Sequence, residues 1–340
     1  MKALLFSLSI CLAALGSQSQ HRTYTNLVFE GAGIRGIAYA GALQQLETRG
    51  VLTHIQKVGG TSAGAITALL VSLGYTSSEI KTIISNTQFQ QFNDGQFLFI
   101  GGLFRMRSHF GWYRGKKFTS WIESFLREKT GNPNITFQQL KQQGFKDLYI
   151  TGTCINRQKL IVFSAQSYPH MKVKDALRIS MSIPLYFKAV FMDSLGKIYS
   201  KPSKVHQLDV MVDGGILANF PIQLFDSIVE VNGISTRIPN PKTLGCRIDT
   251  DEQIQSDKRH HELAPFEVRN VSDYITAFYN LMLETMNRTA LTQDDWDRTI
   301  SISSVGIGPR IKRLRSYQKD SLVNSGFEST QHFFSSSTSH

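Results

Sequence analysis

The chain has 340 residues, of which 41% are hydrophobic and 19% charged, a composition typical of a globular protein with an ample core. The formal net charge of +11 favours an acidic partner. Charge alone does not choose among an anionic membrane surface, a nucleic acid and an acidic substrate.

The first 20 residues, MKALLFSLSICLAALGSQSQ, have one early lysine, an apolar run and small residues near a cleavage-like site, as in a secretory signal peptide. The alternative is a buried N-terminal helix, since the run is too short to span a membrane comfortably. Cys11 follows Ile10, where a bacterial lipoprotein signal would have a small residue, so no lipid anchor is expected. We predict a secreted or periplasmic protein, with a signal peptide at 1–20, one folded domain at 21–334 and a disordered tail at 335–340.

Removal of the signal peptide would leave two cysteines, Cys154 and Cys246, both in apolar strand-like settings. Two thiols do not make a disulfide framework. We expect buried free thiols rather than a single bridge.

A short apolar strand is predicted at 25–29, and after Glu30 comes the glycine loop Gly31-Ala32-Gly33-Ile34-Arg35-Gly36. The next stretch, IAYAGALQQLETRG, has apolar residues at helical spacing and ends at Gly50, a natural helix stop. A dinucleotide fingerprint is an alternative, but it needs an acidic residue at the end of the following strand. That strand ends instead in a second glycine turn, so we expect the two loops to form one site.

The second turn is Gly60-Thr61-Ser62-Ala63-Gly64, which has the G-x-S-x-G pattern of a nucleophilic serine. Apolar residues on both sides predict a strand, a sharp turn and a helix. Glycine is needed at both flanks because a Cβ there would collide with the strand and the helix. The turn would also place the Ala63 amide at a helix N-terminus, where the dipole favours a developing oxyanion. The alternative is a chance match, because so short a pattern is common.

Residues 97–118, FLFIGGLFRMRSHFGWYRGKKF, interleave apolar and aromatic side chains with the cations Arg105, Arg107, Arg114, Lys116 and Lys117. This mixture suits a lipid interface, where rings lie at headgroup depth and cations meet anionic lipid. Core residues beside a solvated face are an equal alternative. Base stacking is less favoured because no nucleic-acid module is recognisable. We expect peripheral contact with an anionic membrane surface and no nucleic-acid partner.

Helices and strands then alternate. A capping box from Thr76 to Glu79 starts one helix, and 117–129 form an amphipathic helix that ends before Gly131. KDLYITGTCIN and KLIVFSA predict two strands, VKDALRISMS a helix, and an apolar strand precedes Asp213-Gly214-Gly215. The alternation predicts an α/β fold with a mainly parallel sheet, whose ligands lie at the carboxyl ends of the strands. Asp213 is there either as a turn former or as a functional carboxylate.

Residues 237–268 are polar, and we expect a mobile loop around one strand, LGCRI. The segment has no glycine at the bend of a calcium loop, and His260-His261-Glu262 does not have the spacing of a helical zinc site, so no metal is expected. A long amphipathic helix is predicted from Ser272, followed by the strand RTISIS. The basic cluster from Arg310 to Lys319 is more typical of a solvated face.

The two glycine turns and Asp213-Gly214-Gly215, in that order, resemble the patatin-like phospholipases. The stretches Tyr113-Arg114-Gly115, LYITGTCINRQKLIVFSA, SMSIPLYFKAV and DGGILANFPI are similar to the family as well. The resemblance is strong from 26 to 222 and looser up to 334. It implies a three-layer α/β/α fold and makes 21–334 a patatin-like catalytic domain.

The resemblance also implies residue roles. Ser62 would be the nucleophile and Asp213 the general base of a Ser-Asp dyad. The oxyanion hole would be formed by the amides of Gly31, Ala32, Gly33 and Ala63, with Ala32 standing where many members have glycine. Arg35 has the motif's basic position and would steady the loop or meet a lipid phosphate. The other motif positions, which shape the site or contact substrate, are Gly36, Gly60, Gly64, Gly214 and Gly215.

The implied activity is that of a lipid acyl hydrolase, of phospholipase A or lysophospholipase type, acting on phospholipid or other acyl lipids through an acyl-enzyme and without cofactor or metal. A hydroxyl, a nearby proton acceptor and aimed donors suffice for this chemistry. The mechanistic alternative is a Ser-Asp-His triad with His260 or His261. The functional alternatives are a lipid-binding or membrane-acting protein on a hydrolase scaffold and a charge-driven nucleic-acid binder. The need for a protein activator is left open.

Overall fold

The computed structural model describes residues 23–95, 106–107, 109–202, 207–231, 233–259, 263–270, 291–309 and 313–336, with isolated positions between 271 and 290. The predicted signal peptide, His260, His261 and most of the helix predicted from Ser272 lie outside the described residues. Among the described residues, no helix is both long enough and apolar enough to cross a bilayer.

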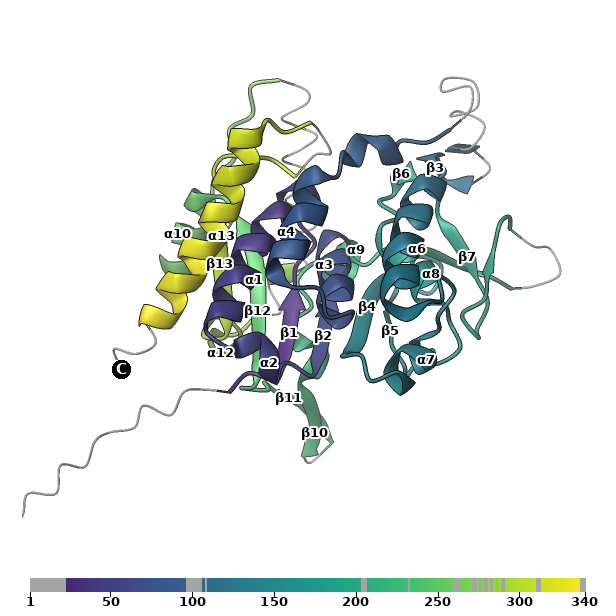
Figure 1. Ribbon diagram of the computed structural model, residues 1–340, viewed down its shortest axis with the longest axis horizontal. Helices are drawn as coiled ribbons and strands as arrows, with labels where there is room; N and C mark the ends of the chain where they lie inside the picture. Colours follow the sequence, from purple (N-terminus) through teal and green to yellow (C-terminus); the bar gives the residue numbers. More distant parts are fainter. Residues whose placement is uncertain are drawn as a thin grey trace, which may run out of the picture.

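A nine-stranded mixed sheet forms the centre of the fold (Figure 1). Its order is β13-β12-β1-β2-β4-β9-β7-β8, and β5 pairs with β4 outside this path. The run from β13 to β4 is parallel, whereas β9, β7, β8 and β5 are antiparallel to their partners. These strands are β1 (Asn26–Phe29), β2 (Lys57–Gly60), β4 (Asp147–Cys154), β5 (Lys159–Phe163), β7 (Val190–Met192), β8 (Ile198–Tyr199), β9 (Asp209–Asp213), β12 (Thr243–Asp249) and β13 (Thr299–Ser303). The predicted α/β class is confirmed.

Helices cover both faces of the sheet. The described helices are η1 (Gly33–Ala38), α1 (Tyr39–Thr48), α2 (Val51–His54), α3 (Ala63–Ser72), α4 (Ser77–Asn86), η2 (Phe89–Phe92), α6 (Lys116–Thr130), α7 (Phe137–Gln142), α8 (Val173–Ser180), α9 (Gly215–Ala218), η3 (Ile222–Phe225), α10 (Asp251–Arg259), α12 (Gln293–Trp296) and α13 (Ser316–Ser336). Two small sheets complete the fold: the parallel pair β3 (Gly111–Tyr113) and β6 (Leu185–Phe187), and the hairpin β10 (Ser227–Val231) and β11 (Ile234–Ile238).

Strand β2 shows how the layers close on the sheet. Successive strand residues point to opposite faces. A Cβ at Gly60 would lie 2.5 Å from the Gly64 backbone of α3, and one at Gly59 would lie 2.6 Å from Leu224 of η3. Helix α3 therefore covers one face and η3 the other. This is the predicted three-layer arrangement. At Gly59 and Gly60 a larger residue would meet η3 or α3.

Two expectations about the C-terminal third are wrong. The polar segment 237–268 contains helix α10 and the end of β11 as well as the expected strand, which is β12. Gln253 and Asp257 of α10 are buried and hydrogen bonded to each other, so polar composition there does not mean a loop. The tail at 335–340 begins inside α13, which continues to Ser336. Cys154 and Cys246 are buried and unpaired, as expected.

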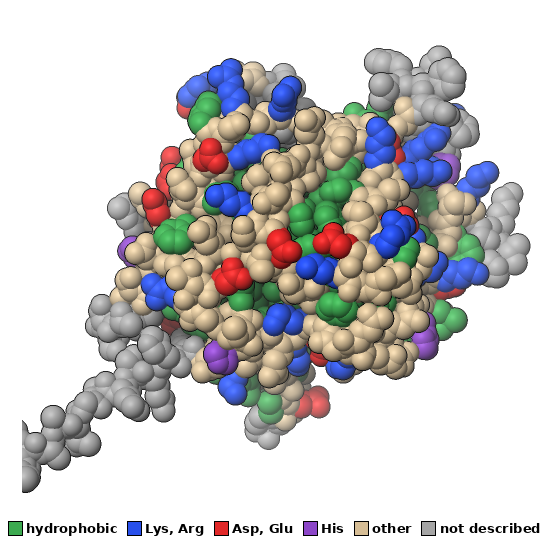
Figure 2. Space-filling model, in the orientation of Figure 1, with side chains coloured by type: hydrophobic (Ala, Val, Ile, Leu, Met, Phe, Trp, Pro, Cys, Tyr) green, Lys and Arg blue, Asp and Glu red, His purple; other side chains and the backbone are tan. Residues whose placement is uncertain are grey.

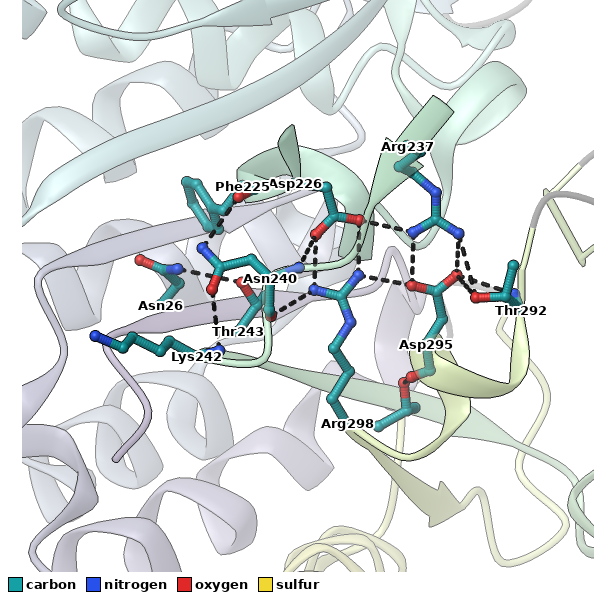
Figure 3. Close-up of polar contacts among 11 residues, drawn as sticks. Asn26, Phe225, Asp226, Arg237, Asn240, Lys242, Thr243, Thr292, Asp295 and Arg298 are labelled. Carbon is teal, nitrogen blue, oxygen red and sulfur yellow. Dashed lines mark hydrogen bonds and ion pairs between the residues drawn. The ribbon is translucent and has the colours of Figure 1, made fainter. Parts of the chain in front are cut away.

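A buried ion cluster holds the β10–β11 hairpin to the amino-terminal edge of the sheet (Figure 3). Arg298 donates to both carboxylate oxygens of Asp226, at 2.7 and 2.8 Å, and to Asp295 at 2.6 Å. Arg237 of β11 donates to the same two aspartates. Because Arg298 precedes β13 and Asp226 precedes β10, the cluster lies at the start of the strands, away from the glycine turns at their ends.

Candidate active site

Ser62 occupies the sharp turn between β2 and α3 that its motif predicts. Its backbone has φ 52° and ψ −121°, a conformation that is strained in any residue with a Cβ. Gly64 cannot be larger because a Cβ there would lie 2.4 Å from the Phe29 carbonyl oxygen. The two glycine flanks thus let β1, β2 and α3 approach closely enough to force the serine into the turn.

The segment that follows α8 supports Ser62 from the side. The Ser62 amide donates to the Ser180 hydroxyl at 2.9 Å, and the Ser62 hydroxyl faces the Met181 sulfur at 3.6 Å. Ser180 is fully buried. Because the strained turn leaves the Ser62 amide without a helix or strand partner, the Ser180 hydroxyl stabilises this backbone by accepting its hydrogen bond.

Asp213 reaches the same site by antiparallel pairing, within a sheet that was expected to be mainly parallel. Gly60 pairs with Ile150 of β4, and Asp213, the last residue of β9, pairs with Gly152 two positions further along β4. The strand β9 therefore enters from beyond the carboxyl edge and ends level with the serine turn. The Asp213 amide donates to the Ser182 carbonyl at 3.0 Å, which links Asp213 to the segment that contacts Ser62.

The carboxylate of Asp213 is buried and accepts the Gly215 amide at Oδ1, at 2.8 Å. Burial raises the pKa of Asp213 to about 7, and the Gly215 amide and the nearby Ser62 hydroxyl only partly oppose this rise. Gly214 fits the turn because a Cβ there would lie 2.3 Å from the Thr151 hydroxyl. An aspartate with this pKa exchanges its proton near neutral pH.

The first glycine loop lies beside Ser62, as expected, but Gly31 does not supply an oxyanion donor. A Cβ at Gly31 would lie 3.4 Å from the Ser62 Cβ, which places the loop against the nucleophile. The Gly31 amide, however, donates to the Asn219 carbonyl at 2.9 Å. An amide that is already bonded within the protein is not free to stabilise a developing charge, so this assignment is corrected.

Three of the expected amides lie at helix starts. Ala32 and Gly33 begin η1, and Ala63 begins α3, so their N–H groups have no acceptor within their own helices. Arg35 donates from Nε to the Ala32 carbonyl at 3.3 Å, which supports the first of its two expected roles, steadying the loop. A Cβ at Gly36 would lie 3.1 Å from the Ala63 Cβ, so this glycine lets the two helix starts converge.

A buried charge cluster fixes the loop from behind. Glu30 accepts from the Asn219 amide group at 3.3 Å and from the Ile248 backbone at 3.0 Å, and Arg247 lies 3.5 Å away. Burial raises the pKa of Glu30 to about 8, against the attraction of Arg247. At Asp249 burial opposes ionisation, but Arg247 and Arg288 outweigh it and lower the pKa to about 2. Sequence reasoning assigned no role to Glu30, Ser180 or Asn219, although the last two lie in stretches that resemble the family.

A groove of about 560 Å³ opens next to the loop. Its lining consists of three apolar residues, three cations and six uncharged polar residues: Ile34, Phe89, Leu314, Arg313, Arg315, Lys319, Ser85, Asn86, Thr87, Gln88, Gln90 and Ser316. Neither Ser62 nor Asp213 lines this groove. Among the described residues, no three His, Cys, Asp or Glu side chains are grouped as metal ligands.

The fold and the site define an α/β protein with a nucleophile-type serine turn beside a buried carboxylate. The family model for patatin-like phospholipase matches residues 27–226, which contain both motifs and Asp213, so the chain belongs to the patatin-like phospholipase family.

Known relatives extend this comparison. The "Uncharacterized protein YqhO" of Bacillus subtilis is 31% identical over 206 residues, which are 59% of this chain and 67% of that protein. The "Probable lipid hydrolase 463L" of Invertebrate iridescent virus 6 is 26% identical over 202 residues, 59% of this chain and 63% of that relative. The crystal structure of VipD from Legionella pneumophila has a TM-score of 0.57 at 14% identity, covering 92% of this chain and 67% of VipD. At that identity the likeness concerns the fold alone.

Proposed function

We propose that this protein is a lipid acyl hydrolase of phospholipase A or lysophospholipase type, with Ser62 as nucleophile and Asp213 as general base. The observation that carries the proposal is the strained Ser62 beside a buried carboxylate whose pKa is raised to about 7. Family membership and the viral relative named as a probable lipid hydrolase support a lipid ester as substrate.

The chemistry proceeds by acyl transfer. Ser62 Oγ attacks the ester carbonyl while its proton passes to Asp213, and the amides of Ala63, Ala32 and Gly33 stabilise the oxyanion. Collapse of this intermediate breaks the ester bond, and the leaving alkoxide takes the proton from Asp213. Water then attacks the acyl-enzyme, gives its proton to Asp213, and fatty acid departs as Ser62 is reprotonated. Every step uses groups of this chain and water.

The test is fatty-acid release from mixed phospholipid vesicles, with a chelator present. We expect Ser62→Ala and Asp213→Asn each to lower the rate by at least about a thousandfold. Ser325→Ala, a buried serine of α13 remote from the site, is the matched control and should retain the wild-type rate.

The double variant His260→Ala/His261→Ala tests the triad alternative. Full activity of this variant supports the dyad. If it alone is inactive while Asp213→Asn turns over, the base is misassigned. Secretion and the signal peptide remain predictions from the sequence, and cleavage is checked by N-terminal sequencing of the exported protein.

A further inference from the structure

The parallel pair β3–β6 exposes two large apolar side chains next to each other. Leu185 opens β6 and is 63% exposed, and it pairs with Gly111 of β3. Phe110 immediately precedes Gly111 and is 48% exposed. The register therefore brings Leu185 within one residue of Phe110 along the strand pair, and we call these two residues, together with the cations described below, the β3–β6 patch.

Both side chains are held in a backbone conformation that residues with a Cβ avoid. Leu185 has φ 67° and Phe110 has φ 58°. Left-handed backbone destabilises such residues, and it persists where function or the surrounding structure requires it. Leu185 is mostly exposed, and Phe110 contacts the buried Phe191 with its ring, at 6.2 Å between centroids, while about half of its surface stays exposed. Burial in the fold therefore does not account for the whole apolar surface of this pair.

Four cations lie within seven residues of Phe110 in the chain, before and after β3: Arg107, Arg114, Lys116 and Lys117. The two lysines are the first residues of α6, at the positive end of the helix dipole, where cations are unfavourable. The carboxylate of Asp94 accepts the amides of Gly115, Lys116 and Lys117, so it caps the helix without pairing the lysine ammonium groups. Within the described ranges, no ion pair involves any of the four cations.

The patch adjoins the candidate active site. Leu185 follows Ser182 by three residues, so their Cα atoms are at most about 10 Å apart. Ser182 accepts the Asp213 amide, and its neighbour Met181 contacts the Ser62 hydroxyl. In Figure 1, β3 and β6 lie at the upper end of the molecule, and Figure 2 shows Lys and Arg side chains gathered there.

We propose that the β3–β6 patch docks the protein onto an anionic lipid membrane. Phe110 and Leu185 enter the interface, and the four cations bind lipid phosphates. Charge complementarity favours a lipid surface, because two exposed apolar side chains with unpaired cations in the adjoining segments match acyl chains beneath anionic headgroups. Docking here brings the lipid ester to Ser62. The benefit of docking for catalysis therefore rests on the proposed function, whereas membrane binding itself does not.

The molecule has another exposed apolar element, the β10–β11 hairpin, where Ile234 is 68% exposed. It lies at the opposite end of the sheet, because it joins β12 at the strand start that pairs with the beginning of β1. A membrane bound there would face away from Ser62. Its comparable exposure makes Ile234 the matched control position.

Binding is measured by co-sedimentation with phosphatidylcholine vesicles, with and without phosphatidylglycerol, in the Ser62→Ala protein so that no lipid is consumed. In Phe110→Asn/Leu185→Asn, asparagine tolerates left-handed backbone, so the fold is kept or stabilised. We expect the partition coefficient to fall about tenfold per side chain. Lys116→Gln/Lys117→Gln should lower binding to anionic vesicles about tenfold, leave neutral vesicles unaffected and weaken the salt dependence. Ile234→Asn should bind as the parent does.

The same asparagine variant is then assayed with intact Ser62. We expect vesicle hydrolysis to fall while hydrolysis of a water-soluble short-chain ester stays at the wild-type rate. The proposal is overturned if the variant binds vesicles as its parent does, or if Ile234→Asn is the change that weakens binding. If the wild-type protein hydrolyses neither vesicle lipid nor the soluble ester, the proposed function is refuted, while the docking result still stands.

Discussion

Ser62 is held in its strained conformation by contacts from three separate parts of the chain. The Ser180 hydroxyl receives its amide, Gly31 lies against its Cβ, and Gly64 lets α3 meet β1. Strain of this kind lasts only where the surroundings over-determine the backbone. The result is a serine held at the same end of the sheet as the buried Asp213 carboxylate before any substrate arrives.

The pH dependence of activity follows from Asp213. The carboxylate must be ionised to accept the Ser62 proton, and burial raises its pKa to about 7. We expect kcat/KM for a soluble ester to fall below pH 7, because the Asp213 carboxylate takes up one proton there, and to level off above it. An inflection near the ordinary value for aspartate, close to 3.8, would contradict this environment for Asp213.

Ser180 is expected to position the nucleophile. Ser180→Ala leaves the Ser62 amide unsatisfied, which should lower the free energy of unfolding by about 1–3 kcal/mol and kcat about tenfold, with KM little changed. Ser325→Ala removes a hydroxyl of α13 that donates to the carbonyl of Ser303 in β13, at 2.8 Å. This control should lose similar stability and no activity. Equal kcat values for the two variants would show that the Ser180 contact is only structural.

At the scale of elements, α13 closes the core by crossing α1 at two glycines. A Cβ at Gly41 would lie 1.8 Å from the Val323 carbonyl oxygen, and one at Gly326 would lie 1.9 Å from that of Ala38. These contacts are with backbone, which cannot move aside as a flexible side chain would. The helix therefore depends on its glycines for packing, although glycine weakens an isolated helix.

Gly326→Ala tests this crossing. Alanine favours the helix by about 1 kcal/mol, but the backbone clash should outweigh this gain and reduce the free energy of unfolding by about 2 kcal/mol. Asn324→Ala, at an exposed position of the same helix, should leave stability equal or slightly higher. Urea denaturation of both variants gives the comparison. If Gly326→Ala raised the free energy of unfolding, α1 and α13 would be able to move apart at this crossing without losing packing energy.

The sequence predicted the local elements well and the non-local ones poorly. The strand, turn and helix at Ser62 were predicted from the local pattern of residues 57–74, and the helix start at Thr76 from its capping box. Helix α10 was missed because its polar residues are buried through pairing, notably Asp257 with Arg288, which no local pattern reveals.

The site shows the same division. Asp213 was found by its motif, but its antiparallel register depends on pairing with β4, more than fifty residues earlier in the chain. The role of Ser180 and the loss of the Gly31 amide to Asn219 depend on contacts between distant segments. Local patterns therefore gave the reactive groups, and tertiary contacts decide which backbone donors remain available to them.

For the whole molecule, the pH of maximum stability should be set by two groups of buried carboxylates, one with raised and one with lowered pKa values. Glu30 and Asp213 have pKa values raised to about 8 and about 7, so their stabilising contribution is complete below about pH 4 and is lost as pH rises through these values. Asp249 and Asp295 have pKa values lowered to about 2, so their contribution is present above about pH 4 and is lost as pH falls.

The free energy of unfolding should therefore be greatest near pH 4 and decline toward both pH 2 and pH 8, as measured by urea denaturation across pH. Asp213→Asn removes one buried charge, so its decline between pH 5 and pH 8 should be shallower than that of the wild type. If the free energy of unfolding of the wild type were greatest at pH 8, the raised pKa values of Glu30 and Asp213 would be contradicted.

The central claim is that Ser62 is a nucleophile activated by Asp213, and covalent labelling tests it most directly. The protein is treated with an alkyl fluorophosphonate, and intact mass and peptide mapping locate the adduct. We expect one adduct per chain on Ser62, none in Ser62→Ala, and labelling at least about a hundredfold slower in Asp213→Asn. Label on another residue, or undiminished labelling of Asp213→Asn, would contradict the claim.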